Sequence, residues 1–289
     1  MLLQDPFTNF DIWDAIESGL YYIIIGYYFL IFAYFVFMRY RTSKKLYWFY
    51  FSLLFLCLAA SRVFFIIYYF YTPELKGTLL PPDPKLLKIV DQLMLLFRLA
   101  TFSLWIGIAC LMGVLGMLIF PPLTEETTKS EGDNIKIKLK NWLINENVRI
   151  ILKIVLIIIP IFIGILVFLL PDSLLMDPDF VDEYGVSASN LITIFGYPAG
   201  RAVLNFILLP LFVAIIPFLF INLARRTFGV LRKSYALNAI GFFIYFIGRI
   251  LQGLLDTLEY QHVRAILPPL LILLSLLIIV IANNYEQLR

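Results

Sequence analysis

Seven long apolar runs account for most of this chain of 289 residues, and they constrain its fold more than any other feature. None alternates apolar and polar residues with the period of a barrel strand, so helices are the expected spanning structure. A helix needs roughly 20 residues to cross the hydrocarbon core of a bilayer. The sequence therefore predicts an all-α integral membrane protein, with residues 1–289 forming a single seven-helix membrane domain. The predicted helices cover residues 20–38, 46–70, 92–119, 150–170, 201–221, 235–256 and 264–283.

The composition agrees with immersion in lipid. Hydrophobic residues make up 61% of the chain and charged residues 15%, whereas a soluble domain carries about 25% charged residues. The net charge is +3 and no long basic tract occurs, so the sequence has no electrostatic footprint for nucleic acid. The residues before the first run carry acids rather than the basic residues of a signal peptide, which predicts that this run is retained as a helix.

Lysine and arginine in the connections predict the orientation of the helices, because cytoplasmic loops are enriched in these residues. The connections after the first, third and fifth runs are basic, and the opposite side carries most of the acids. We therefore expect the N-terminus outside, the C-terminus inside and a location in the cell membrane. The basic residues are Arg39, Arg41, Lys44, Lys45, Lys129, Lys136, Lys138, Lys140, Arg149, Arg225, Arg226, Arg232 and Lys233.

The ends of the first and fifth runs resemble each other. Residues 34–37 (Tyr-Phe-Val-Phe) and 217–220 (Pro-Phe-Leu-Phe) are each followed by a short basic loop, and Arg62 and Arg249 then lie at similar distances along the next runs. A parallel 3+1+3 repeat, with the fourth run as linker, would explain this resemblance, because an odd linker helix keeps both triplets in the same orientation. The other explanation is that any two helix pairs running from inside to outside share basic loops and aromatic ends.

Three arginines lie within the apolar runs at a similar expected depth. Counting from the inner ends of their runs, Arg62 lies roughly 24 Å and Arg249 roughly 21 Å from the inner boundary. Arg98 lies roughly 9 Å below the outer boundary. All three fall in the outer third of a core about 30 Å thick. Because a guanidinium facing lipid there is unfavourable, these side chains are expected to face the interior of the bundle.

Further polar residues share helix faces with these arginines. Gln252 and Asp256 follow Arg249 at helical spacing, and Asp91 precedes Arg98 by two turns of helix. The second, third and sixth helices are therefore predicted to place arginines and carboxylates around one outward-facing cavity, with Asp91 and Asp256 as the nearest counter-charges. The candidate ligand-binding residues are Arg62, Arg98, Arg249, Gln252, Asp256 and Asp91.

This pattern predicts a pocket for a small polar or anionic ligand, because a guanidinium fork donates two parallel hydrogen bonds to carboxylate or phosphate. The structural alternative is a set of interhelical salt bridges, or arginines that snorkel to the outer headgroups. The favoured function is a receptor or sensor that signals through its inner loops to a separate cytoplasmic effector. The alternative is a 3+1+3 small-solute transporter, and a third hypothesis is a lipid-binding or assembly protein in contact with membrane lipids.

The sequence offers little for catalysis or metal binding. His262 is its single histidine, and Cys57 and Cys110 lie in separate apolar runs, so these residues cannot assemble a usual zinc site. No His-Glu-x-x-His, Gly-x-Ser-x-Gly or phosphate-loop pattern occurs. We therefore expect no metal, no cofactor and no enzymatic activity.

Overall fold

Helices dominate the structure, a computed structural model that describes residues 11–72, 79, 84–120, 146–186, 191–194, 196–257 and 260–284. Within these ranges, seven helical segments are long and apolar enough to cross a membrane, which confirms the predicted number of spans. The segments are Ile12–Ser43, Leu46–Tyr71, Pro84–Ile119, Glu146–Leu169, Ala199–Arg226, Gly229–Leu255 and His262–Asn284.

Three of these segments contain short stretches of π-helix. The first segment consists of α1 (Ile12–Tyr34), η1 (Phe35–Tyr40) and α2 (Arg41–Ser43), and the second consists of α3 (Leu46–Ile66) and η2 (Ile67–Tyr71). The third is α4 (Pro84–Ile119) and the fourth is α6 (Glu146–Leu169). The fifth consists of α9 (Ala199–Ala202), η5 (Val203–Leu208) and α10 (Leu209–Arg226), and the last two are α11 (Gly229–Thr257) and α12 (Gln261–Asn284).

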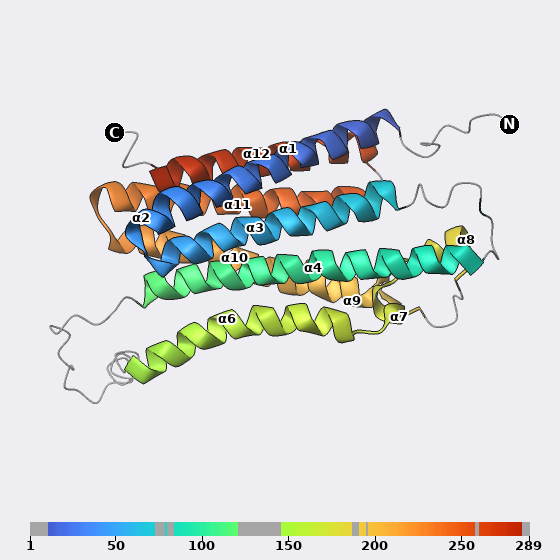
Figure 1. Ribbon diagram of the computed structural model, residues 1–289, viewed down its shortest axis with the longest axis horizontal. Coiled ribbons are helices and arrows are strands. Elements are labelled where there is room, and N and C mark those ends of the chain that lie inside the picture. The colour runs from blue at the N-terminus through green and yellow to red at the C-terminus, as the bar shows by residue number, and fades with distance from the viewer. Residues whose placement is uncertain are drawn as a thin grey trace.

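The connection between the fourth and fifth segments also contains regular structure. It carries two short helices, α7 (Asp172–Leu175) and α8 (Phe180–Tyr184). A small antiparallel hairpin follows, in which β1 (Thr193–Ile194) pairs with β2 (Tyr197–Pro198). These elements lie at the end of the bundle where α1 begins, on the side of α4 and α6 (Figure 1).

Several helices extend beyond the apolar runs that predicted them. The first helix begins at Ile12 rather than at residue 20, because Asp11 and Asp14 form a reciprocal capping box that satisfies backbone N–H groups of its first turn. The third helix begins at Pro84, where the fixed φ of proline suits the first turn. An apolar run marks the part of a helix that lipid covers, whereas caps and prolines determine where the helix starts.

The spanning helices form a ring of six with one helix outside it. The helices α1, α3 and α4 pack against one another in sequence order, and so do α10, α11 and α12. Contacts of α1 with α12 and of α4 with α10 close the ring. The helix α6 packs along α4 on the outside, at the edge of the bundle in Figure 1.

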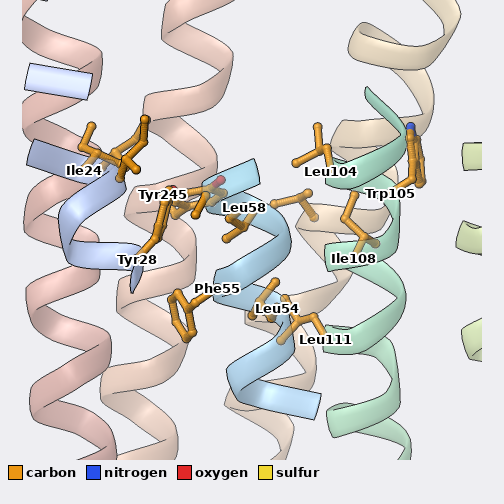
Figure 2. Packing of buried hydrophobic residues seen from close by; sticks show 14 of the residues in the cluster. Ile24, Tyr28, Leu54, Phe55, Leu58, Leu104, Trp105, Ile108, Leu111 and Tyr245 are labelled. Carbon is orange, nitrogen blue, oxygen red and sulfur yellow. The ribbon is translucent and has the colours of Figure 1, made fainter. Parts of the chain in front are cut away.

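The core lies between the helices of the ring and is largely aliphatic and aromatic. In Figure 2, Leu54 and Leu58 of α3 face Leu104, Ile108 and Leu111 of α4. All five side chains are buried. Large apolar side chains on the outer surface of the bundle are exposed, as expected for positions that face lipid. Examples of exposed residues are Leu30, Phe162, Leu211, Phe218 and Leu277.

A polar network joins the helices at the end of the bundle opposite the hairpin. Arg39 of η1 donates to the backbone carbonyl of Asn283 and to the side chain of Asn284, both at 3.0 Å. Asn283 in turn donates to Asn238 of α11 at 3.0 Å. The guanidinium of Arg39 also lies 5.4 Å from the ring centroid of Trp48 on α3. These contacts fix α1, α3, α11 and α12 relative to one another where α2 turns the chain (Figure 1).

Candidate ligand-binding site

A cavity of about 370 Å³ lies inside the ring of six helices. This volume falls within the range of pockets that hold small molecules. The six ring segments all contribute side chains to its lining, and the peripheral helix α6 contributes none. Its polar or titratable lining residues are Asp14, Glu17, Arg62, Tyr69, Tyr197, Asn205, Tyr245, Arg249, Gln252 and Arg264.

Most of these polar residues gather at one end of the cavity. Asp14 and Glu17 lie in the first turns of α1, and Arg264 lies in the first turn of α12. Arg62 and Arg249 lie near the ends of α3 and α11, which run in the opposite direction. In neighbouring antiparallel helices, the first turn of one lies beside the last turn of the other. These side chains therefore lie close together at the end of the bundle where α1 begins.

Two of the three predicted arginines meet in this cavity. Arg62 on α3 and Arg249 on α11 both donate to the side-chain oxygen of Gln252, each at 3.2 Å. Gln252 reaches both because it lies three residues after Arg249, on the same face of α11. The structure therefore brings together Arg62, Arg249 and Gln252, three of the six candidate residues.

The guanidinium of Arg62 is deeply buried. The residue is 4% exposed, and its guanidinium carbon lies 4.5 Å from the ring centroid of Tyr21 on α1. A desolvated cation over an aromatic face gains roughly 2 kcal/mol. Tyr21 is itself buried, on the same face of α1 as Glu17. This ring holds Arg62 in place without neutralising its charge.

The hydrogen-bond partner that Arg62 and Arg249 share is neutral, and the carboxylate of Glu17 acts on Arg62 electrostatically without forming an ion pair with it. Gln252 is neutral, and no described carboxylate lies within ion-pair distance of either guanidinium. Two cations that share one amide oxygen repel each other, and a buried charge without a counter-charge is costly. An anion placed between the two guanidinium groups would relieve both effects.

A third cation of the cavity has a counter-charge of its own. Arg264 of α12 lies 3.4 Å from the carboxylate of Glu17 on α1, and Glu17 is 4% exposed. Glu17 precedes the first predicted helix, which starts at residue 20, and it is not one of the candidate residues predicted from the sequence. The sequence did contain a signal for the burial of Glu17. Tyr21 follows Glu17 by four residues and Tyr28 follows Tyr21 by seven, so all three lie on one face of α1, which is buried.

Arg98 does not lie in the cavity, contrary to the sequence prediction. It donates to the backbone carbonyls of Phe168 at 2.6 Å and Leu170 at 2.7 Å, and it pairs with Asp172 at 2.7 Å. The last carbonyls of a helix lack donors within that helix, and a cation at this end is favourable. Arg98 therefore caps the C-terminal end of α6, which packs beside it on α4.

The predicted counter-charges also differ from those observed. Asp91 is exposed, lies outside the cavity lining and does not balance Arg98, whose carboxylate partner is Asp172. The side chain of Asp256 lies outside the described residues, so its predicted role is not addressed by the structure. Sequence spacing along one helix identified possible partners, but the acids that pair with arginines come from neighbouring elements.

Arg201 is a buried arginine that sequence analysis placed only at the edge of a span. It is 3% exposed, and it donates to the backbone carbonyl of Leu175 and to the hydroxyl of Tyr68 at 2.8 Å. Its guanidinium carbon lies 4.1 Å from the ring centroid of Phe97, and Asp177 lies 3.6 Å away. Arg201 thus connects α9 to the α7–α8 connection and to η2 and α4.

The described residues offer no cluster for a metal ion, since no three His, Cys, Asp or Glu side chains among them come together. Comparison of the chain with protein-family models, with curated proteins and with solved structures finds no match. The seven apolar helices make this chain a multi-pass membrane protein. Its function must therefore be argued from the cavity.

Proposed function

We propose that this protein is a receptor or sensor that binds a small anionic ligand in the intramembrane cavity. The observation that carries the proposal is the pair Arg62 and Arg249, which line one cavity and share the neutral side chain of Gln252. Intramembrane arginines that face a cavity mark ligand or ion sites by default. The ligand's carboxylate or phosphate would accept hydrogen bonds from both guanidinium groups.

Arg98, which is half-buried, and Arg201, which is buried, support this interpretation by contrast. Arg98 and Arg201 have carbonyl acceptors and a carboxylate neighbour each, which is what a structural arginine requires. Arg62 and Arg249 have neither among the described residues. The chain is able to satisfy a buried guanidinium, so the different surroundings of this pair favour a role in binding.

The proposal includes the orientation of the chain. We place the N-terminus outside and the C-terminus inside a cell membrane, because the basic connections follow the first, third and fifth helices. In this orientation the polar end of the cavity lies toward the outside. Ligand binding would shift α10 and α11, and the basic inner connections would pass the change to a separate cytoplasmic effector. No step of this function requires catalysis by the chain.

The second candidate function is a small-solute transporter built from a 3+1+3 repeat. The pattern of helix packing is consistent with such a repeat. In this reading α1, α3 and α4 correspond to α10, α11 and α12, and the peripheral α6 is the linker. Within each triplet the middle helix packs against the other two. The first helix of each triplet also packs against the third helix of the other, through the contacts of α1 with α12 and of α10 with α4. Transporter substrates bind at such repeat interfaces. Flux of a small anion in proteoliposomes would support this candidate over the receptor.

A thermal-shift screen of small carboxylates and phosphates tests the binding role. Arg249→Ala should weaken binding by roughly 1.5–3 kcal/mol, the range for a hydrogen bond to a charged group. Arg249→Lys should recover only part of this loss, because lysine lacks the planar fork. Arg232→Ala is the matched control, since Arg232 is exposed on the same helix. Equal ligand-induced shifts in the wild type and in Arg249→Ala would refute the binding role.

A further inference from the structure

The cavity extends well beyond its polar end, and the rest of its wall is apolar. On α3, Leu54, Phe55 and Leu58 continue the lining face of Arg62 over the preceding turns. Leu104 and Ile108 of α4 line the opposite side. Figure 2 shows Leu54, Leu58, Leu104 and Ile108 between α3 and α4, where they belong both to the core and to the cavity wall. The cavity therefore continues from its polar end along an apolar wall, and we call this part the apolar channel.

The second triplet completes this channel. Val213 and Ile216 of α10, Phe242 of α11, and Leu276 and Ile279 of α12 line it at the level farthest from the arginines. All five are buried. Among the described residues, no charged side chain belongs to this part of the lining, so its wall is apolar on both sides.

The length of the channel follows from helix geometry. Leu54 precedes Arg62 by eight residues, which corresponds to roughly 12 Å along a helix. On α12, Arg264 and Ile279 both line the cavity and are fifteen residues apart, which corresponds to roughly 22 Å. The cavity is thus long and narrow, because its volume of about 370 Å³ is spread over several helix turns.

We infer that the ligand is a single-chain anionic amphiphile, whose head binds Arg62 and Arg249 and whose acyl chain occupies the apolar channel. This inference rests on the proposed function and specifies its ligand class. A small anion alone would fill the polar end and leave the channel walls without contacts. An acyl chain would bury apolar surface along the whole channel, and each buried methylene contributes favourably. One anionic head suits two guanidinium groups that share a neutral amide.

Binding should be measured with the full chain in nanodiscs of phosphatidylcholine, without detergent, because a detergent is itself an amphiphile. The tracer is radiolabelled laurate, with empty nanodiscs as background. The competitors are laurate, dodecyl phosphate, butyrate and dodecanol. We expect laurate or dodecyl phosphate to compete at aqueous concentrations at least tenfold below those of butyrate and dodecanol, which lack the chain or the charge. The stronger of the two anions identifies the head as carboxylate or phosphate.

Two variants test the site of the acyl chain and the site of the anionic head separately. Val213→Phe places a ring in the apolar channel and should weaken laurate binding at least tenfold while leaving the thermal shift by butyrate unchanged. Leu211→Phe is the matched control, because Leu211 lies on the same helix, is 56% exposed and faces outward. Arg249→Ala should weaken both anions.

The outcomes separate this inference from the function on which it rests. Butyrate that binds as tightly as laurate in the wild type, with both sensitive to Arg249→Ala, would overturn the amphiphile and leave the anion site intact. Absence of saturable binding by every anion would overturn both. The series of competitors on the wild type gives this answer even if Val213→Phe fails to fold.

Discussion

Replacing Arg201 by alanine should destabilise the protein more than replacing any other single arginine outside the cavity. The substitution removes a buried cation that connects three parts of the chain. It leaves the carbonyl of Leu175 and the hydroxyl of Tyr68 without this donor, and it removes the guanidinium from the face of Phe97. Asp177, at 3.6 Å, loses a neighbouring charge.

The size of the effect follows from these contacts. A hydrogen bond to a charged group contributes roughly 1.5–3 kcal/mol, and a desolvated cation over a ring contributes roughly 2 kcal/mol. Because such contributions are not additive, we expect Arg201→Ala to lower the free energy of unfolding by about 3–5 kcal/mol, as for other broken buried pairs. Asp177→Asn should cost only about 0–1 kcal/mol, because the Asp177 side chain is 33% exposed and its ion pair with Arg201 is long.

Unfolding by guanidinium chloride in micelles of a nonionic detergent, followed by circular dichroism, measures these differences. Tyr68→Phe should fall between the two variants, since it removes one hydroxyl and keeps the ring beneath the guanidinium. Arg225→Ala is the control, because Arg225 is an exposed arginine at the end of α10. If Asp177→Asn destabilises the protein as much as Arg201→Ala, the ion pair rather than the carbonyl and ring contacts holds this region, and the reasoning is wrong.

Three further results are expected. In a background without the native cysteines, Ser43→Cys and Asp179→Cys should react with an impermeant thiol reagent from opposite sides of the membrane, and reaction from one side would defeat the proposed topology. Gly200→Ala should lower thermal stability by roughly 1–3 kcal/mol, because its Cβ would lie 2.8 Å from the carbonyl oxygen of Leu174, while Gly26→Ala, with open space around it, should have little effect. Arg98→Ala should lower the melting temperature but leave anion-induced shifts intact, because Arg98 caps α6 and does not line the cavity; a lost ligand shift would contradict this placement.

Sequence reasoning succeeded where one helix carries the whole pattern. Gln252 was predicted beside Arg249 because residues three apart share a helix face, and both line the cavity. Arg62 was predicted to face inward because lipid is a poor environment for a guanidinium, and it is buried. Both inferences depend only on helix geometry and on the cost of charge in lipid.

The same reasoning failed where the answer depends on which helices are neighbours. Arg98 and Arg62 have a similar expected depth, and both are flanked by apolar residues in the sequence. Arg98 nevertheless faces α6, because α6 packs on that side of α4. Arg201 looked like a residue of a span edge, but the α7–α8 connection folds over it and supplies a carbonyl and a carboxylate. Glu17 became a cavity residue because α1 packs against α12, which brings Arg264 to it.

The sequence by itself determined the class of protein and the number of spans, because a bilayer requires every spanning segment to satisfy its own backbone hydrogen bonds along a long apolar run. It also determined which residues are too polar to face lipid. Only the tertiary structure decided which of these residues meet. The shared contact of Arg62 and Arg249 with Gln252 depends on which helices are neighbours, and so does the capping of α6 by Arg98. That order is set by side-chain packing between segments far apart in the chain, and the periodicity of one helix carries no information about it.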